Sequence, residues 1–407
     1  MPQLRVRLAT LAVALSLLAC ASPLTRPTLE PPATGVALTL RALASAAPTS
    51  TPTDTPQPPA TLAPASLLPH ALYFLAADEA GLTQVFRLDS DGRSLHQLTF
   101  ERASVDTYDV SPQDGSVAYS SNNQLFLEDA TGAGRRLLID AGPIDDNNRW
   151  TNSLGMPVWS PDGQTLAFGH GGLNFLTLAT GAIARVLENQ VDTSAGFPVV
   201  GRIYTPNAYS PDGSHLLISI GFYEGGTFGI YSLSDNRVIQ LQRSDGGTIC
   251  CHANWIPDGT GLYIASPSLG MIESGLFYAN SANGAVTALL PGAPPDGTYN
   301  FADAAQVGLD GQLYFFFSNL PAIPVSGHTP LSLVRSASDG VTGRRQLLPT
   351  SFENINEILW ARDASLAILI VAPDADTYAG GRAHVVYPDS RPSVHILQSA
   401  RDLRWGP

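Results

Sequence analysis

From about residue 70 onward, short apolar runs alternate with tight polar turns. Leu166-Ala167-Phe168 and Leu216-Leu217-Ile218 each follow such a turn, and each run has the length of a strand. The turns combine Pro, whose fixed φ suits the second turn position, with Gly, which adopts a positive φ without steric cost. This pattern predicts an all-β chain built from many short antiparallel strands.

One turn unit recurs along the chain. Its four clear copies are Val110-Ser111-Pro112-Gln113-Asp114-Gly115, Trp159-Ser160-Pro161-Asp162-Gly163, Tyr209-Ser210-Pro211-Asp212-Gly213 and Trp255-Ile256-Pro257-Asp258-Gly259. Two weaker copies are Gly308-Leu309-Asp310-Gly311 and Trp360-Ala361-Arg362-Asp363-Ala364. The aspartates of the six copies recur every 46 to 53 residues. Each interval holds four strand-like segments, and four antiparallel strands repeated about every 50 residues indicate one propeller blade.

The two ends of this region complete the count of blades. Residues 71–99 contain three strand-like segments but no first strand, and Asp402-Leu403-Arg404-Trp405 resembles the missing one. One blade assembled from both termini and six internal blades predict a seven-bladed β-propeller closed by a C-terminal strand, which removes exposed sheet edges. Six or eight blades stay open as alternatives, because the last two repeats are degraded.

The aromatic-Ser-Pro-Asp-Gly unit followed by an apolar strand resembles the WD40-like propeller repeats of the periplasmic protein TolB and its relatives. The resemblance covers nearly all of residues 70–407 and implies a TolB-like propeller domain over residues 67–407. Related repeats also form the propellers of prolyl-oligopeptidase-like peptidases. The sequence contains neither their hydrolase domain nor a Gly-x-Ser-x-Gly nucleophile elbow.

The first residues resemble an export signal. Arg5 and Arg7 precede an apolar run from Leu8 to Ala19, which is shorter than the ~20 residues of a membrane span. The run ends in Leu17-Leu18-Ala19-Cys20, which looks like a bacterial lipobox. That resemblance implies a signal peptide over residues 1–19, lipidation of Cys20 and an extracytoplasmic protein anchored to a bacterial membrane, in the periplasm or on the cell surface. An ordinary secretory signal with a chance cysteine is the alternative.

Residues 20–66 are rich in Pro and Thr and poor in large apolar side chains, which predicts a disordered tether.

The formal net charge is −13 and all basic residues are arginine. An acidic chain is a poor match for nucleic acid, and we expect the lipid alone to supply membrane attachment. The absence of lysine also excludes a P-loop lysine, a Schiff-base lysine and a Ser-Lys dyad.

Blade connections alternate between two faces. Turns that join the first strand to the second and the third to the fourth are short and define the turn face. Loops between second and third strands, and links between blades, define the opposite loop face and are longer, for example over residues 138–156, 188–206, 221–229, 243–252 and 372–384. Because long loops on a rigid scaffold often carry function, we expect ligand binding on the loop face. The candidate ligand-binding residues there are Asp145, Asp146, Asn147, Arg149, Trp150, Phe222, Tyr223, Glu224, His252, Tyr378 and Arg382.

Two of these loops are chemically distinct. The segment from Asp145 to Trp150 combines carboxylates, amides, a guanidinium and an indole, a set suited to a sugar or a peptide. A solvated acidic loop with Trp150 packed on the neighbouring blade is the structural alternative. Phe222-Tyr223-Glu224 places aromatic side chains at a loop tip, where they either recognise a partner or fold back on the blade.

Cys250 and Cys251 are adjacent and, apart from Cys20, are the only cysteines. In an oxidising compartment they either bond to each other or stay free. A vicinal disulfide is the favoured hypothesis, in a link that leads toward the central channel. A metal site with His252 is disfavoured, because consecutive strand residues point to opposite faces, and we predict no metal and no cofactor.

Polar residues on the first strands should point toward the channel. They are Asp109, Asn207, Asn254, Asp303, Glu357 and Asp402. The leading hypothesis is a non-catalytic binding or scaffold lipoprotein that recognises an envelope protein, a peptide or a glycan, with no catalytic residues. The alternative is a propeller-type hydrolase or lyase with acidic residues in the channel mouth, which requires clustered groups of perturbed pKa there. A passive envelope component is the third reading.

Overall fold

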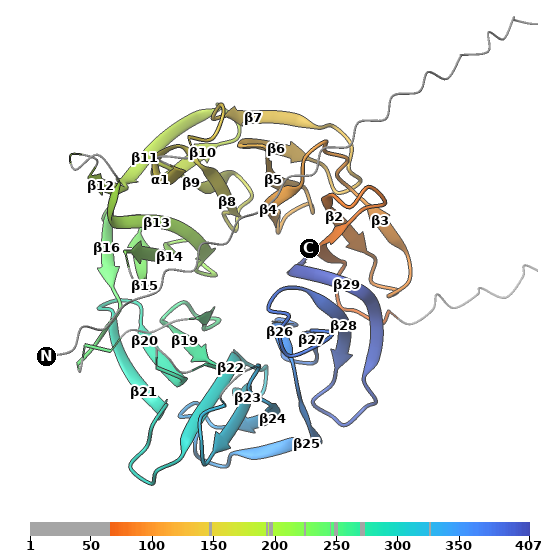
Figure 1. The fold of residues 1–407 in the computed structure, drawn as a ribbon, viewed down its shortest axis with the longest axis vertical. Helices are drawn as coiled ribbons and strands as arrows, with labels where there is room; N and C mark the ends of the chain where they lie inside the picture. The colour runs from red at the N-terminus through yellow and green to blue at the C-terminus, as the bar shows by residue number, and fades with distance from the viewer. Residues whose placement is uncertain are drawn as a thin grey trace, which may run out of the picture. The chain divides into compact units, whose positions relative to one another are not determined.

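The computed structural model describes residues 66–145, 149–192, 194, 198–223, 225–244, 246–247, 251–268, 273–324 and 327–407. These residues form seven four-stranded antiparallel blades around a central axis (Figure 1). The first strand of each blade lies nearest the axis, and the fourth lies at the rim. The predicted seven-bladed all-β propeller is therefore confirmed.

The blades follow the chain in order, and blade 7 contains both termini of the propeller. Blade 1 comprises β4 (Val105–Val110), β5 (Val117–Ser121), β6 (Gln124–Glu128) and β7 (Arg136–Asp140). Blade 2 comprises β8 (Leu154–Trp159), β9 (Thr165–His170), β10 (Gly172–Thr177) and β11 (Ala182–Glu188). Blade 3 comprises β13 (Val199–Tyr209), β14 (His215–Phe222), β15 (Gly225–Ser232) and β16 (Arg237–Gln240). Blades 4 and 5 comprise β18 (His252–Trp255), β19 (Gly261–Ser266), β20 (Gly275–Asn280), β21 (Ala285–Pro291); and β22 (Tyr299–Val307), β23 (Leu313–Leu320), β24 (Leu331–Ser336), β25 (Arg345–Phe352). Blade 6 comprises β26 (Ile355–Trp360), β27 (Ala367–Val371), β28 (Gly381–Val386) and the first half of the long β29 (Val394–Trp405). Blade 7 comprises the second half of β29, β1 (Leu72–Ala77), β2 (Thr83–Leu88) and β3 (Leu95–Gln97).

Three short elements lie outside this four-stranded plan. β12 (Gln190–Asp192) pairs with the start of β13, β17 (Gln242–Arg243) pairs in parallel with β21, and α1 (Arg149–Asn152) is a single helical turn. The loop expected over residues 188–206 is therefore partly a strand hairpin. The loop expected over 221–229 is shorter still, because β14 continues through Phe222 and β15 begins at Gly225. Backbone pairing between the two strands extends as far as Phe222 and Gly225.

The recurring turn unit shows why its residues are needed. In blade 2, Ser160 Oγ donates to Asp162 Oδ1 (2.6 Å) and accepts from the Thr165 amide (2.9 Å). Gly163 has φ +69°, a conformation that is costly for residues with a Cβ. Blade 3 repeats this arrangement with Ser210 and Asp212. The unit thus fixes the hairpin that follows each first strand.

β29 closes the ring. Its first half pairs with β28 in blade 6, and its second half pairs with β1 in blade 7, so one strand belongs to two blades. The Gly406 amide then donates to Ala71 O (2.9 Å) and joins the two ends of the propeller. The C-terminal first strand predicted from residues 402–405 is confirmed.

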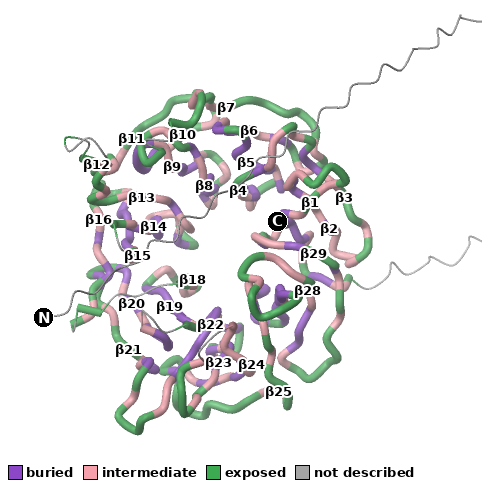
Figure 2. Tube along the Cα trace, in the orientation of Figure 1, coloured by how far each residue is buried: buried purple, intermediate pink, exposed green. Residues whose placement is uncertain are grey.

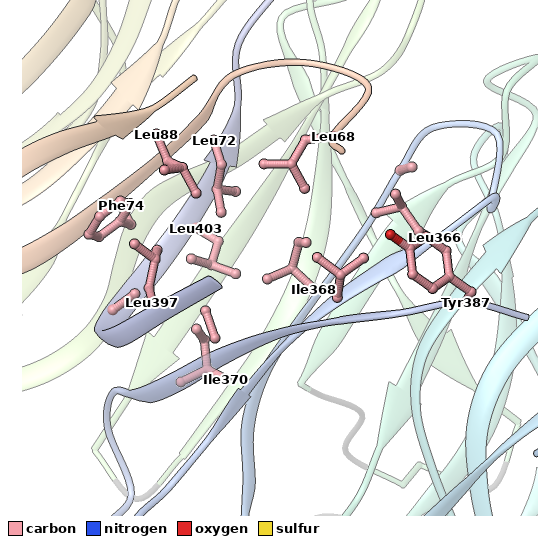
Figure 3. Packing of buried hydrophobic residues seen from close by; sticks show 14 residues of the cluster. Leu68, Leu72, Phe74, Leu88, Leu366, Ile368, Ile370, Tyr387, Leu397 and Leu403 are labelled. Atoms are coloured by element: carbon pink, nitrogen blue, oxygen red, sulfur yellow. The ribbon is translucent and has the colours of Figure 1, made fainter. Parts of the chain in front are cut away.

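Buried apolar side chains of neighbouring blades pack together in shared clusters. The rim strands β7, β11 and β25 are largely exposed (Figure 2). At the closing joint, Leu72 and Phe74 from the start of the propeller pack with Ile370 and Leu403 from its end (Figure 3). Leu403 is fully buried. The joint is therefore held by a shared apolar core as well as by backbone pairing.

Shortening Leu403 should weaken this joint. We expect Leu403→Ala to lower the free energy of unfolding by about 2–5 kcal/mol, because it removes buried methyl groups and leaves a cavity. Leu309→Ala is the matched control, since Leu309 is 89% exposed, and it should change stability by no more than about 0.5 kcal/mol. Urea unfolding of both variants checks this, and equal midpoints would contradict the role given to Leu403.

Candidate functional site

Five first strands end in an aromatic residue, which in four of them directly precedes a turn unit. Trp159, Tyr209, Trp255, Trp360 and Trp405 all line one cavity of about 930 Å³, to which every blade contributes. Their indoles also join the blades: Trp255 Nε1 donates to Ala208 O (3.2 Å), and Trp405 Nε1 donates to Trp360 O (2.8 Å). These residues form an incomplete aromatic ring around the axis, to which five of the seven blades contribute.

This axial cavity opens on the turn face. Its lining includes Pro112, Pro161, Pro211 and Pro257, which belong to the first-to-second-strand turns. It reaches inward along β18 to His252, three residues before Trp255, a distance of about 10 Å at ~3.3 Å per strand residue. The cavity is thus a deep well rather than a surface depression.

Carboxylates on the first strands bind the backbone of the next blade. Asp109 Oδ2 accepts from the Trp159 amide (2.7 Å), and Glu357 Oε1 accepts from the Leu403 amide (2.6 Å). Burial raises the pKa of Asp109 and also that of Glu357, although these hydrogen bonds oppose the change. Tyr108 Oη completes the set by donating to Asp402 O (2.6 Å). These groups serve as inter-blade connections.

Bulges decide which first-strand residues face the axis. Register shifts interrupt the pairing of β4, β8, β13, β22 and β26 with their second strands. Met156, Ala304 and Asp402 have positive φ values of 54°, 45° and 53° on first strands. The Met156 amide is thereby turned to donate to Thr107 Oγ1 of blade 1 (2.9 Å). Simple alternation along a strand does not hold here.

Two ion pairs stand at different positions around the axis. Arg404 Nε lies 3.5 Å from Asp109 Oδ1, between blades 7 and 1. Burial lowers the pKa of Arg404, but the charge of Asp109 and the nearby Tyr108 and Glu357 outweigh it, so the net change is upward. His252 Nδ1 contacts Asp303 Oδ1 between blades 4 and 5.

The charge of Asp303 raises the pKa of His252 to about 9, against a smaller opposing effect of burial. Glu357 adds a further upward contribution. The imidazole is therefore protonated at neutral pH. Its side chain is 43% exposed because it faces the open axis, whereas Asp303 is only 5% exposed.

A second cavity of about 610 Å³ lies where the link from β3 to β4 meets blade 1. Arg135 binds both oxygens of Glu101 (2.6 and 3.0 Å), and Tyr119 Oη contacts Glu101 Oε1 (2.8 Å) and Glu128 Oε1 (2.6 Å). One phenol cannot donate fully to two carboxylates. Burial raises the pKa of Glu128, against the opposing effect of the hydrogen bond from Tyr119.

The structure places the predicted loop-face residues on several blades. Asp145, Arg149 and Trp150 lie in the link between blades 1 and 2, Phe222 and Tyr223 at the tip of blade 3, and Tyr378 and Arg382 in blade 6. Trp150 is 44% exposed, and the Tyr378 ring stacks on His328 at 4.9 Å. Of the described candidates, His252 and Cys251 line the axial cavity.

The remaining candidates lie outside the described residues: Cys20, Asp146, Asn147, Glu224 and Cys250. Cys251 is disulfide-bonded. No group of three or more His, Cys, Asp or Glu within the described ranges is arranged to hold a metal ion. No helix in the described part of the chain is long and apolar enough to cross a membrane.

Sequence reasoning placed six polar residues at the channel. Asp109, Asn207 and Asn254 line the cavity, whereas Asp303, Glu357 and Asp402 are not among its lining residues. Sequence reasoning did not single out Arg404 or the aromatic ring. The signal was available for the aromatic residues, because they stand at a fixed position before the turn unit. No sequence signal marks Arg404, because the bulge at Asp402 determines where the Arg404 side chain points.

These features define a seven-bladed β-propeller with an axial cavity. No protein-family model and no curated protein matches the sequence. Similar solved structures include TolB from Acinetobacter baumannii, at 14% identity over 83% of this chain and 67% of that one (TM-score 0.43). Another comes from a study of two prolyl endopeptidases, at 12% identity over 82% of this chain and 49% of that one (TM-score 0.51). The chain spans about half the length of that second structure, and the likeness concerns the fold alone.

The His252–Asp303 pair should make stability depend on pH. A free imidazole has a pKa of about 6.5, whereas the pKa of His252 in the fold is about 9. The stability that the ion pair adds to the folded state is therefore fully present below pH ~6.5. It is lost as pH rises toward 9. We expect the melting temperature of His252→Gln to fall less over this interval than that of the parent. His96→Gln, on the exposed β3, is the control, and an unchanged pH dependence in His252→Gln would contradict this assignment.

Proposed function

We propose that this protein is a non-catalytic recognition protein, held outside the cytoplasm by a lipid on Cys20, which takes its ligand into the axial cavity. The observation that carries the proposal is the cavity itself. Its volume of about 930 Å³ lies in the usual range of ~300–1,000 Å³ for ligand pockets, and it combines aromatic walls with a few polar groups. Such a composition is typical of binding sites.

The loop face supports a second contact with a macromolecular partner. Exposed aromatic side chains occur on its links and loops: Phe100 is 75% exposed, Tyr223 79% and Tyr378 66%. Exposed aromatic groups on the loops of a rigid scaffold favour recognition. The protein, peptide or glycan partner expected from the sequence therefore has a surface to meet, separate from the axial cavity.

A hydrolase or lyase is the second candidate, because acids and a histidine with raised pKa do cluster along the axis. Their partners favour recognition instead. Asp109 and Glu357 each accept a backbone hydrogen bond from the adjacent blade, which explains why the fold keeps them. His252 is protonated at neutral pH and cannot act there as a general base.

Filling the axial cavity should abolish ligand binding. Thermal unfolding of the full chain against a panel of peptides and glycans finds ligands, since one present at 100 times its Kd adds about 2.7 kcal/mol of stability. We expect Ala253→Phe, which enlarges a residue of the cavity wall, to remove that stabilisation. Ala282→Phe, at an exposed turn of the same blade, is the control. A ligand that stabilises both variants equally would show that it binds elsewhere, and turnover of any panel member would favour the enzyme.

The anchor is tested separately. We expect Cys20→Ser to move the protein from the membrane fraction to the soluble fraction of the producing cells, because a single thiol carries the proposed lipid. Detergent phase partitioning measures this, with Cys250→Ser as the matched control. Retention of Cys20→Ser in the membrane fraction would contradict lipid anchoring at this residue.

A further inference from the structure

We infer that the axial cavity selects ligands that carry a carboxylate on an aromatic or apolar body. The inference rests on the proposed function, in that the cavity is the ligand site, and adds the chemical class of the ligand. Four charged residues line the cavity: Asp109, His252, Arg362 and Arg404. Three of the four are basic, in a chain whose formal net charge is −13. The cavity therefore differs in charge from the protein as a whole.

Both ion pairs present their basic member to the cavity. Asp303 is 5% exposed and His252 43%; Asp109 is 18% exposed and Arg404 45%. Asp303 does not line the cavity, and Asp109, which does, also accepts the Trp159 amide. A ligand that enters the cavity therefore meets the more exposed N–H donors of His252 and Arg404. An anion is the ligand group that such donors bind best, through charge-assisted hydrogen bonds.

The guanidinium of Arg404 has donors to offer. It carries five N–H groups, of which Nη1 donates to Leu403 O (2.8 Å) and Nε points to Asp109. Glu357 is an acid that acts on both cations, after Asp303 for His252 and after Asp109 for Arg404. It accepts the Leu403 amide, and burial raises its pKa. Glu357 does not line the cavity, so an incoming anion does not meet it directly.

The walls determine the rest of the ligand. Trp159 and Trp360 are more than nine-tenths buried, so that only ring edges reach the cavity. The rings of Trp255, Trp405 and Tyr209 are partly exposed. Aromatic walls of this kind stabilise an aromatic or aliphatic group by burying it and by ring contacts. A carboxylate without an apolar body would leave this surface in water. The combination favours an amphipathic acid, such as an acylated amino acid or the carboxyl end of a peptide.

A matched pair of probes tests the charge requirement. Isothermal titration of the full chain compares N-acetyltryptophan with N-acetyltryptophanamide, which differ in the carboxylate. We expect the acid to bind at least about tenfold more tightly, and Arg404→Gln and His252→Gln each to reduce that ratio severalfold. Arg391→Gln, on an exposed turn of blade 6 away from the cavity, is the control and should leave the ratio unchanged.

Each outcome decides the question. Equal affinities for acid and amide, or no binding of either, would overturn the charge inference. A preference for the acid that survives in both variants would also overturn it, because other groups would then hold the anion. The cavity as a ligand site is judged independently by Ala253→Phe. Should Arg404→Gln unfold, His252→Gln provides the same comparison, with its melting temperature below pH 9 as the check on folding.

Discussion

Closure of the ring by β29 is the constraint on which the rest of this structure depends. The blades pack side by side, and each covers the apolar flank of its neighbour, so an open array would expose two flanks. β29 removes both by pairing with β28 and with β1. Leu403 then buries itself between blades 6 and 7. The axial cavity exists because seven first strands are held at fixed positions around one axis, and that requires a closed ring.

The same side chains join the blades and give the axis its chemistry. Asp109 binds the Trp159 amide and pairs with Arg404. His252 pairs with Asp303 at the junction between blades 4 and 5. A polar group near the axis has the adjacent blade as its natural partner, because water reaches it only through the cavity. Acids are therefore used to connect blades, and the bases paired with them are more exposed to the axial cavity. Architecture and binding surface are thus not independent in this molecule.

The sequence determined much of this fold in advance. The spaced turn units, each with Pro and Gly at conformationally demanding positions, sufficed to predict the blades, and the truncated first blade predicted the C-terminal closing strand. Details of the axis were less accessible. Bulges at Met156, Ala304 and Asp402 re-aim neighbouring side chains, and nothing in the local composition signals them. The long loop predicted over residues 221–229 is instead mostly strand, because the hairpin of β14 and β15 pairs as far as Phe222 and Gly225. The sequence thus indicated where strands occur more reliably than where they end or bulge.

The hydrogen bond from the Gly406 amide to Ala71 O places the two described ends of the propeller next to each other. A ring whose ends meet has no structural beginning, so the place where the polypeptide starts is a property of its connectivity and not of its packing. A chain cut at a link between two other blades and rejoined at this seam contains the same contacts. The order of the seven blades along the chain can therefore change while their order around the axis stays the same. Only the order around the axis shapes the cavity.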